Sequence, residues 1–419
     1  MANVSFGRIE GKSFAFWGFL ALMAALVAAM LGASYYMEHH GHIVTGMNNQ
    51  IVWGAPHVFA VFLIVAASGI LNVASVGSVF NRAPYKPLAR LSGVMAITLL
   101  VGGLAVLVLD LGRPDRLVVA MTRYNFRSIF AWNIFLYTGF MAVVFVYLWF
   151  QMERRMSKLA RPMGFVAFGW RIILTTGTGS IFGFLVARQH YDAAIMAPMF
   201  VVLSFLYGLA IYLLFLMGAA RGTGRPLGDQ ILQRLKGLLV VFVWAALYFE
   251  LVRHTTNLYA AEHRAAEAWL LTGDSVYTTL FWLGQVGVGL LLPLALLHLP
   301  ATGRTRAGIA AASVAVIVGG IAQMYVTIIG GEAYPLQLFP GKEVTSTFFD
   351  GQMGTYAPST PEVVLGIGGM ALAVLATTFL LKLFPILPWD LSDKAVPGEK
   401  AASEPQQAEP EEQPEAQAA

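Results

Sequence analysis

Ten long apolar runs limit the possible folds of this protein more than any other feature of its sequence. A helix needs about 20 residues to cross roughly 30 Å of hydrocarbon, and its backbone polar groups must find their partners inside the helix. The runs cover residues 14–36, 55–80, 91–109, 129–150, 164–187, 195–219, 235–252, 276–299, 307–330 and 362–384. Arg171 and Glu250 interrupt the ends of the fifth and seventh runs. We therefore predict an all-α integral membrane protein with about ten transmembrane helices, arranged as two four-helix bundles plus two flanking helices.

The composition agrees with a membrane location and excludes several kinds of chemistry. Of the 419 residues, 57% are hydrophobic and only 12% are charged, whereas a soluble domain carries about a quarter charged residues. The chain has no cysteine, which excludes disulfides, cysteine-bound iron–sulfur clusters and thiol catalysis within it. Electrons that pass through this protein would therefore need another carrier. The net charge of +4 is too small for a nucleic-acid surface, so we expect no nucleic acid among its partners.

Lysine and arginine sort between the two sides of the predicted membrane domain. Most of the 27 lie in the two termini and in the loops that follow the even-numbered runs, which the positive-inside rule assigns to the cytoplasm. We expect a multi-pass membrane protein with both termini cytoplasmic. The loop at residues 110–128 departs from this pattern, because it lies on the outer side yet carries four basic residues. We infer that this loop has a local function.

The chain divides into a membrane domain and two flanking segments. Residues 1–13 form a short cytoplasmic N-terminus, and residues 14–387 form the transmembrane domain, with bundles at about 55–187 and 195–330. The starts of the second and sixth runs resemble each other, which indicates either a parallel repeat of the bundles or a coincidence of two proline-initiated helices. Residues 388–419 are rich in Pro, Glu, Gln and Ala with few apolar side chains, so we expect a disordered acidic cytoplasmic tail.

Titratable side chains gather at the outer ends of the runs. His57 lies one turn into the second run, after a loop that contains Asn49 and Trp53. It is either an interfacial histidine beside an aromatic-belt tryptophan or a hydrogen-bond partner for the carbonyl of a lipophilic ligand. Tyr137 in the fourth run is an ordinary interfacial residue unless its side chain points inward.

A second group of titratable residues ends the seventh run. The stretch "YFELVRHTTNLY" places Glu250, Arg253 and His254 at positions i, i+3 and i+4, which share one helical face. This pattern indicates either an internal salt bridge with a snorkelling arginine or a proton-handling cluster, since histidine titrates near neutral pH. Glu332, after the ninth run, adds another carboxylate at the outer end.

The motif "DLGRPDR" gives the unusual outer loop its chemistry. Asp110 ends the third run, and a glycine and a proline then permit a tight exit into a short interfacial helix with Asp115 in its first turn. Arg113 and Arg116 can bind carboxylates or backbone carbonyls through two parallel hydrogen bonds, within the subunit or on a docked partner. Arg188, in the loop after the fifth run, joins them as a candidate docking residue. Arginines that only bind lipid headgroups would be expected on inner loops instead.

These motifs carry a resemblance to a known family. "LDLGRPDR", "YNFRSIFAWNIFLY", "FWLGQVGVGLLLP" and "YVTIIGGEAYP" resemble stretches of the membrane subunits of the polysulfide reductase/NrfD family. "GHIVTGMNNQIVWGAPHVF", together with "YPLQLFPG", looks closest to the P subunit of the DsrMKJOP complex that is associated with sulfite reduction. The resemblance covers roughly residues 14–385.

The resemblance implies a quinone- or quinol-interacting membrane subunit of a respiratory electron-transfer complex. Such a subunit has no redox centre and no covalently bound cofactor of its own, and it binds menaquinone or ubiquinone as a substrate. It exchanges electrons with a periplasmic iron–sulfur subunit of the same multi-subunit complex, here in sulfur metabolism. We therefore expect a non-autonomous part of a quinone-linked oxidoreductase.

The resemblance also assigns candidate residues. His57 matches a quinone-contacting histidine of the family, while Gly54 stands where some relatives have an asparagine, so Asn49 is a candidate for the polar partner. The candidate quinone-binding residues are His57, Trp53, Asn49, Asp110, Arg113 and Tyr137. The candidate proton-transfer residues are Asp110, Glu250, His254 and Glu332. The candidate docking residues are Arg113, Asp115, Arg116 and Arg188. No metal ligand and no catalytic residue is expected.

Two other functions stay open from the sequence. A secondary transporter would have inverted repeats and polar residues at the middle of the membrane, whereas the polar residues here gather at one end. A b-type cytochrome membrane anchor would need paired histidines, for which His57 and His254 are the candidates. The middles of the runs are nearly free of ionisable groups, which disfavours proton pumping.

Overall fold

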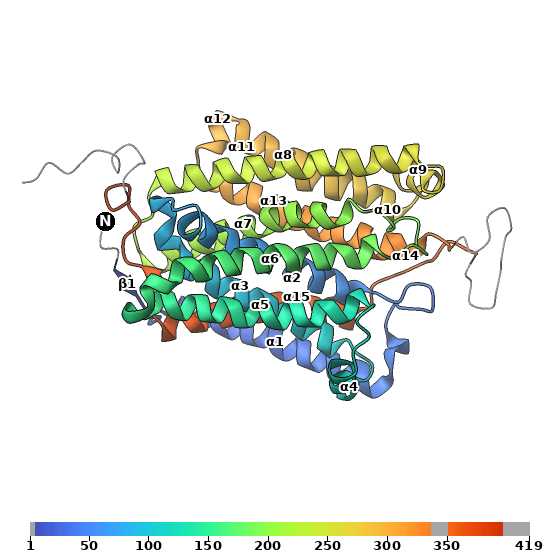
Figure 1. Ribbon diagram of the computed structural model, residues 1–419, viewed down its shortest axis with the longest axis horizontal. Coiled ribbons are helices and arrows are strands. Elements are labelled where there is room, and N and C mark those ends of the chain that lie inside the picture. Colours follow the sequence, from blue (N-terminus) through green and yellow to red (C-terminus); the bar gives the residue numbers. More distant parts are fainter. Residues whose placement is uncertain (1–4, 337–350, 397–419) are drawn as a thin grey trace, which may run out of the picture.

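The computed structural model describes residues 5–336 and 351–396, and the membrane domain within them is almost entirely helical (Figure 1). Ten helical segments in this part of the chain are long and apolar enough to cross a membrane, and they run along the long axis of the molecule. The first five are α1 (Phe14–His40), α2 (Ala55–Ser78), α3 (Ala89–Leu109), α5 (Ile129–Met152) and α6 (Ala160–Gly183). The others are α7 (Met196–Thr223), α8 (Asp229–Tyr259), two composite spans that begin at α10 (Val276–Thr279) and α13 (Arg306–Tyr325), and α15 (Thr360–Leu383). The predicted all-α membrane fold is confirmed.

The two composite spans contain π-helical segments. α10 continues through η5 (Leu280–Leu291) into α11 (Leu292–His298), and α13 continues through η6 (Val326–Gly330) into α14 (Gly331–Ala333). π-helical turns are rare and occur frequently near functional sites. η5 packs against both α13 and α8, so the widened helix borders the buried polar cluster of α8 that is described below.

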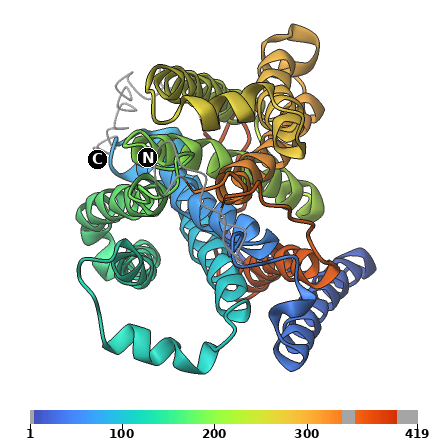
Figure 2. The ribbon, with the colours of Figure 1, turned by 90° about the vertical axis from the view of Figure 1, so that its right-hand side faces the viewer.

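Short elements connect the spans at the two ends of the molecule. They are the 3₁₀ helices η1 (His42–Val44), η2 (Ala83–Leu88), η3 (Pro114–Arg116) and η4 (Arg154–Leu159), and the helices α4 (Leu117–Thr122), α9 (Arg264–Thr272) and α12 (Pro300–Gly303). Figure 2 shows α4 standing apart from the bundled helices, at the tip of a long excursion between α3 and α5. The predicted interfacial segment after "DLGRPDR" is therefore helical and lies to one side of the bundle.

α2 lies at the centre of the helix packing. It contacts α3, α6, α7, α13 and α15, whereas α1 packs mainly on α15 and exposes its remaining faces. α2 and α7 cross closely at Gly69 and Gly208, where a Cβ on either glycine would overlap backbone atoms of the other helix. Contacts run from α2 to α3, α5, α6 and back to α2, which is compatible with the predicted first bundle. The division into two bundles stays a prediction.

Both described ends of the chain lie at the same end of the molecule, which we call the inner end; the opposite end is the outer end (Figure 1). There β1 (Phe6–Gly7) pairs antiparallel with β2 (Leu387–Pro388). The segment 388–396, which the sequence analysis assigned to the tail, packs onto this end, because Leu391 is buried and bridges to Leu227. The rest of the predicted tail, residues 397–419, lies outside the described residues.

Candidate functional site

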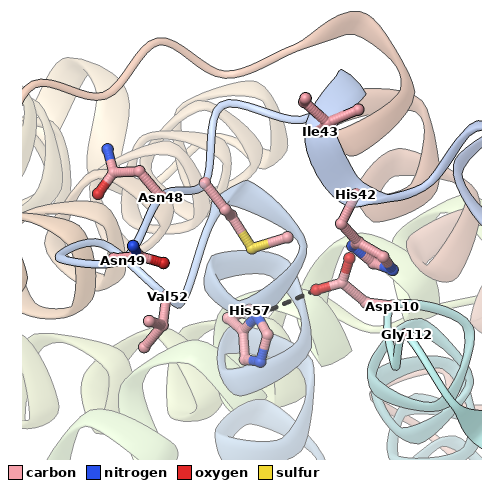
Figure 3. Close-up of a pocket in the computed structure, with 9 residues that line it drawn as sticks. His42, Ile43, Asn48, Asn49, Val52, His57, Asp110 and Gly112 are labelled. Carbon is pink, nitrogen blue, oxygen red and sulfur yellow. Dashed lines mark ion pairs between the residues drawn. The ribbon is translucent and has the colours of Figure 1, made fainter. Parts of the chain in front are cut away.

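A pocket of about 520 Å³ opens at the outer end of the molecule (Figure 3). It lies between the loop that follows α1, the first turn of α2 and the end of α3. Its lining residues are His42, Ile43, Met47, Asn48, Asn49, Val52, His57, Asp110 and Gly112. The volume falls within the range of about 300–1,000 Å³ that is typical of small-molecule sites.

A histidine and a carboxylate from two different helices meet in this pocket. His57 lies in the first turn of α2, which Pro56 initiates, and Asp110 is the C-terminal cap of α3. His57 Nδ1 lies 3.2 Å from Asp110 Oδ2, and only 1% of the Asp110 side chain is exposed against 24% for His57 (Figure 3). Neither Asp110 oxygen has a partner with hydrogen-bond geometry among the described residues. An unsatisfied buried polar group costs about 1–3 kcal/mol, so a hydrogen-bond donor placed in the pocket would stabilise this carboxylate.

His42 is a third titratable side chain in the pocket, and the sequence analysis did not include it among the candidates. Its side chain lies next to Asp110 in Figure 3, and its Nε2 is buried with no hydrogen-bond partner in the described part of the chain. His42 belongs to η1, a single turn that no apolar periodicity marks. The only signal in the sequence was its place in the histidine-rich stretch between two apolar runs.

A buried carboxylate at the start of α15 holds the loop over the pocket in place. Glu362 is fully buried and accepts hydrogen bonds from Gly46 N (2.8 Å), Ser359 N (2.7 Å) and the Tyr356 hydroxyl (2.8 Å). The Tyr356 hydroxyl in turn accepts a hydrogen bond from Ala55 N at 2.7 Å, at the first residue of α2. The pocket rim is therefore fixed by hydrogen bonds to a distant part of the chain.

Three of the six predicted quinone-binding residues line the pocket: Asn49, His57 and Asp110. Trp53 lies outside the lining but stacks beside His57, with ring centroids 6.1 Å apart. Tyr137 is buried on α5, and its hydroxyl lies 3.5 Å from that of Thr178. Its side chain thus points inward, although not into the pocket.

Arg113, the first arginine of the "DLGRPDR" motif, does not line the pocket. Arg113 donates two hydrogen bonds of 3.0 Å to the Asp115 carboxylate, and both side chains are more than half exposed. The hydrogen bond from Arg113 lowers the pKa of Asp115 below its ordinary value. Arg116 is exposed beside them. Arg188, by contrast, is bound inside the chain, because it donates to the carbonyls of Glu332 (2.7 Å) and Gln50 (2.9 Å).

A second buried cluster of titratable groups lies at the outer end of α8. His254 bridges two carboxylates, with Nε2 3.1 Å from Glu250 Oε2 and Nδ1 2.5 Å from Glu267 Oε1. Asn257 donates to Glu267 Oε2 at 3.1 Å. Glu250 also accepts a hydrogen bond from Gln323 on α13. With both His254 nitrogens directed at carboxylates, neither faces a haem iron.

The cluster continues toward the middle of the membrane domain. The Tyr207 hydroxyl on α7 donates to Gln323 Oε1 at 2.6 Å, so an unbroken chain of polar side chains runs from Glu267 through His254 and Glu250 to Tyr207. All of these residues are buried. The sequence predicted only the Glu250 and His254 part of this chain.

Arg253 does not pair with Glu250, although the helical spacing allowed it. Its Nη2 lies 3.2 Å from both Nε2 and the carbonyl oxygen of His190. Burial, together with the charge of Arg253, lowers the pKa of His190 to about 3, so His190 is neutral and can accept this hydrogen bond.

Burial alone would raise the pKa of Glu267, but the hydrogen bond from His254 keeps it below its ordinary value.

Glu332 connects the pocket loop to the second half of the molecule. Its carboxylate is buried and accepts a hydrogen bond from Trp53 N at 3.0 Å. Its carbonyl accepts the hydrogen bond from Arg188. Glu332 therefore lies behind the pocket loop, and it is not among the residues that line the pocket.

A charged residue lies in the middle of the membrane domain, where the sequence analysis expected almost none. Arg171 is fully buried near the centre of α6 rather than at its end. Its Nη2 donates to Asn72 Oδ1 at 3.0 Å, and its guanidinium lies 4.6 Å from the Phe205 ring centroid. Its Nε and Nη1 have no partner among the described residues. Phe168, whose ring centroid lies 4.8 Å from the guanidinium, is on α6 itself, but Asn72 and Phe205 are on other helices, so the run could not reveal them.

Comparison with known proteins gives relatives that are membrane subunits. A family model described as "Polysulphide reductase, NrfD" matches residues 43–335, a range that includes His57, Asp110 and the buried cluster of α8. The Hdr-like menaquinol oxidoreductase integral membrane subunit of Archaeoglobus fulgidus is 30% identical over 390 residues, which cover 92% of this chain and 97% of that protein. A putative dimethyl sulfoxide reductase membrane subunit of Halobacterium salinarum is 28% identical over 88% of this chain and 91% of its own length. A polysulfide reductase component of Wolinella succinogenes is 23% identical over 59% of this chain and 83% of its own length.

Proposed function

The chain belongs to the polysulphide reductase NrfD family, and from this premise we propose that it is the quinone-binding membrane subunit of a respiratory oxidoreductase complex. The observation that carries the proposal is the buried Asp110 carboxylate, which lacks a hydrogen-bond partner among the described residues and faces an open pocket beside His57. A quinone or quinol headgroup offers two oxygens that can use this pair. Menaquinone or ubiquinone would be the bound substrate.

The pocket chemistry fits a two-electron carrier that also exchanges protons. Oxidation of a quinol to a quinone releases two electrons and two protons. The Asp110 carboxylate can accept a quinol hydroxyl proton, and His57, 3.2 Å away, can share it or accept the second. His42 adds a further acceptor on the same wall. In the opposite direction, the same three groups can supply protons to the two quinone oxygens.

The electrons must pass to a partner, because the chain has no cysteine and the described residues hold no group of three or more metal-binding side chains. We propose a periplasmic iron–sulfur subunit that docks at the outer end, with the outer end facing the periplasm, the inner end the cytoplasm and the protein in a bacterial inner membrane. The resemblance to the P subunit of the DsrMKJOP complex favours a role in sulfur metabolism. Relatives named as membrane subunits of oxidoreductases favour this function over a transporter or a cytochrome.

The excursion at residues 111–127 is the proposed docking surface. It is largely exposed, with Val118 at 64% and Phe126 at 63%, and it carries Arg113, Arg116 and Asp115. Interfaces combine exposed aromatic and apolar side chains with arginine, which is the composition found here. Its first residues border the pocket through Gly112. A partner seated here would lie next to the bound quinone.

We also propose that the polar side chains from Glu267 to Tyr207 handle protons. Histidine between two carboxylates can exchange a proton with either of them, and the hydrogen-bonded amide and hydroxyl extend this network inward. The Glu332 carboxylate, which is bonded to the pocket loop through Trp53 N, is a further candidate for proton transfer.

Quinone binding is tested on the purified complex. We expect His57→Ala to lower the amount of quinone that co-purifies, and to weaken quinol binding by about tenfold or more, because a hydrogen-bonding ring is lost from the pocket. His39→Ala, an exposed histidine at the same end, is the matched control and should retain quinone. Quinone extracted and quantified from both proteins decides the question. Equal quinone content and affinity in the two variants would argue against the pocket.

Docking is tested by charge reversal on the excursion. Arg116→Glu should weaken association with the co-purifying iron–sulfur subunit by about tenfold, and the loss should be smaller at high salt, because exposed charges act mainly on encounter. Arg155→Glu, an exposed arginine at the inner end, serves as the control. Subunit retention during purification at low and high salt measures both effects. Unchanged retention at every salt concentration would exclude this surface.

A further inference from the structure

A second cavity, of about 850 Å³, opens at the inner end of the molecule, far from the proposed quinone pocket. Helices α7 and α15, together with the N-terminal segment and the start of α1, supply most of its wall, and residues of α2, α3 and α13 close it. α15 packs on α1, α2 and α3, while α7 packs on α2, α6, α8 and α13, and the cavity lies between these two groups of helices.

The deep part of the cavity is apolar, and no buried polar atom of its described lining is unsatisfied. Phe62, Leu63 and Leu99 form its inner wall and are buried in the protein. The Thr378 hydroxyl, which also lines it, already donates to Val374 O at 2.8 Å. None of the described lining side chains has an unpartnered buried nitrogen or oxygen. A quinone headgroup would find no unpaired buried donor or acceptor here. A hydrocarbon chain has no polar group to satisfy, so its burial carries no such cost.

The α7 wall leaves open space in the cavity. Gly218 and Gly222 both line it, and a Cβ built on either glycine would have no heavy atom within 4 Å. They lie four residues apart, so they face the same side of α7. The two glycines therefore leave one face of α7 open toward the cavity.

The mouth of the cavity is basic. Lys12 pairs with Glu10 at 2.9 Å, and Arg225 donates to the carbonyls of Leu387 and Arg8 at 2.7 Å each. The Arg8 side chain is exposed. The three basic side chains outnumber the single carboxylate. Trp389, which also lines the mouth, is of the type that anchors at the membrane–water interface.

We propose that this cavity binds an anionic phospholipid, with one acyl chain along Gly218 and Gly222 and the phosphate at Arg8 and Lys12. An apolar interior under a basic rim matches an acyl chain under an anionic headgroup, and clusters of basic residues between membrane helices favour such headgroups. The tip of the acyl chain would reach Phe62 in the deep part of the cavity. The centroid of the Phe62 ring lies 5.1 Å from that of the Tyr207 ring. The site is separate from the quinone pocket and does not depend on the proposed function.

Lipid titration of the delipidated, detergent-solubilised full-length protein tests the site. We expect dioleoyl phosphatidylglycerol to raise the melting temperature of the wild type more than dioleoyl phosphatidylcholine does, because only bound lipid stabilises the folded state. Gly218→Leu should remove this difference by filling this part of the cavity. Gly32→Leu, at a glycine of α1 that is equally open, is the matched control and should keep it.

A variant at the rim keeps the test decisive if Gly218→Leu fails to fold. Arg8→Glu changes only an exposed side chain, and it should weaken phosphatidylglycerol binding by about tenfold without lowering the stability of the lipid-free protein. Native mass spectrometry of the untreated protein should retain phospholipid in the wild type and lose it in both variants. Equal response to the two lipids, an unchanged response of Arg8→Glu, or a quinone retained in this cavity would overturn the proposal.

Discussion

Asp110→Asn lowers quinol-linked electron transfer by about a hundredfold or more, since general acid–base groups contribute roughly 10²–10⁴-fold to rates. Asparagine preserves the size of the side chain and can still hydrogen-bond, but it cannot accept a proton. The loss should therefore fall on turnover more than on the affinity for quinol. The measurement is the initial rate of quinol oxidation by the intact complex with an artificial electron acceptor.

Asp274→Asn is the matched control for this result. Asp274 lies at the same end of the molecule, between α9 and α10, and its side chain is exposed. We expect its turnover to stay within about twofold of the wild type, because it lies outside both the pocket lining and the docking surface, where substitutions of exposed side chains have small effects. Equal rates for the two variants would show that the buried carboxylate of Asp110 is not part of the reaction.

His254→Leu destabilises the protein by about 3–5 kcal/mol, the cost of removing one member of a buried charged group. The variant leaves Glu250 and Glu267 buried without the side chain that lies between them. The free energy of unfolding in mild denaturant measures the loss. His39→Leu should change it by less than about 0.5 kcal/mol, because His39 is exposed.

A double variant distinguishes a lost charge network from a simple packing defect. His254→Leu with Glu267→Leu removes both partners of the short contact, so it should be less destabilised than the single His254→Leu variant. If the two effects add instead, the histidine acts through packing alone.

The same cluster predicts how stability depends on pH. The folded-state pKa of Glu267 lies below its ordinary value of 4.5. A lowered pKa means that its contribution to stability is complete above about pH 4.5 and is lost as the pH falls through the folded-state value. Glu267→Gln should therefore lose less stability than the wild type on acidification below pH 4.5, and thermal unfolding at pH 6 and pH 4 measures the difference.

The helices followed from the sequence, because a run of apolar residues long enough to cross lipid has only one hydrogen-bonded solution. His57 and Asp110 could be placed at the outer end because each lies at the end of such a run. Their contact at 3.2 Å could not be predicted, because it depends on how α2 packs against α3. Arg113 was assigned to the pocket from its place in the motif, and the structure instead pairs it with Asp115 on the surface.

The residues that the sequence analysis missed share one property. Glu267, Gln323 and His42 each obtain their role from a side chain on another element, so no spacing within their own segment marks them. Arg171 looked like an interruption of an apolar run, and Asn72, its hydrogen-bond partner, lies on α2. Hydrophobic periodicity indicates which face of a helix is buried. It does not indicate which polar side chain of the neighbouring helix lies against that face.

The Glu362 carboxylate has a consequence for how the tenth span and the outer pocket are related. One side chain both caps the first turn of α15, through Ser359 N, and holds the pocket loop, through Gly46 N. The two parts are linked through this one side chain, although 316 residues separate Gly46 from Glu362 in the sequence.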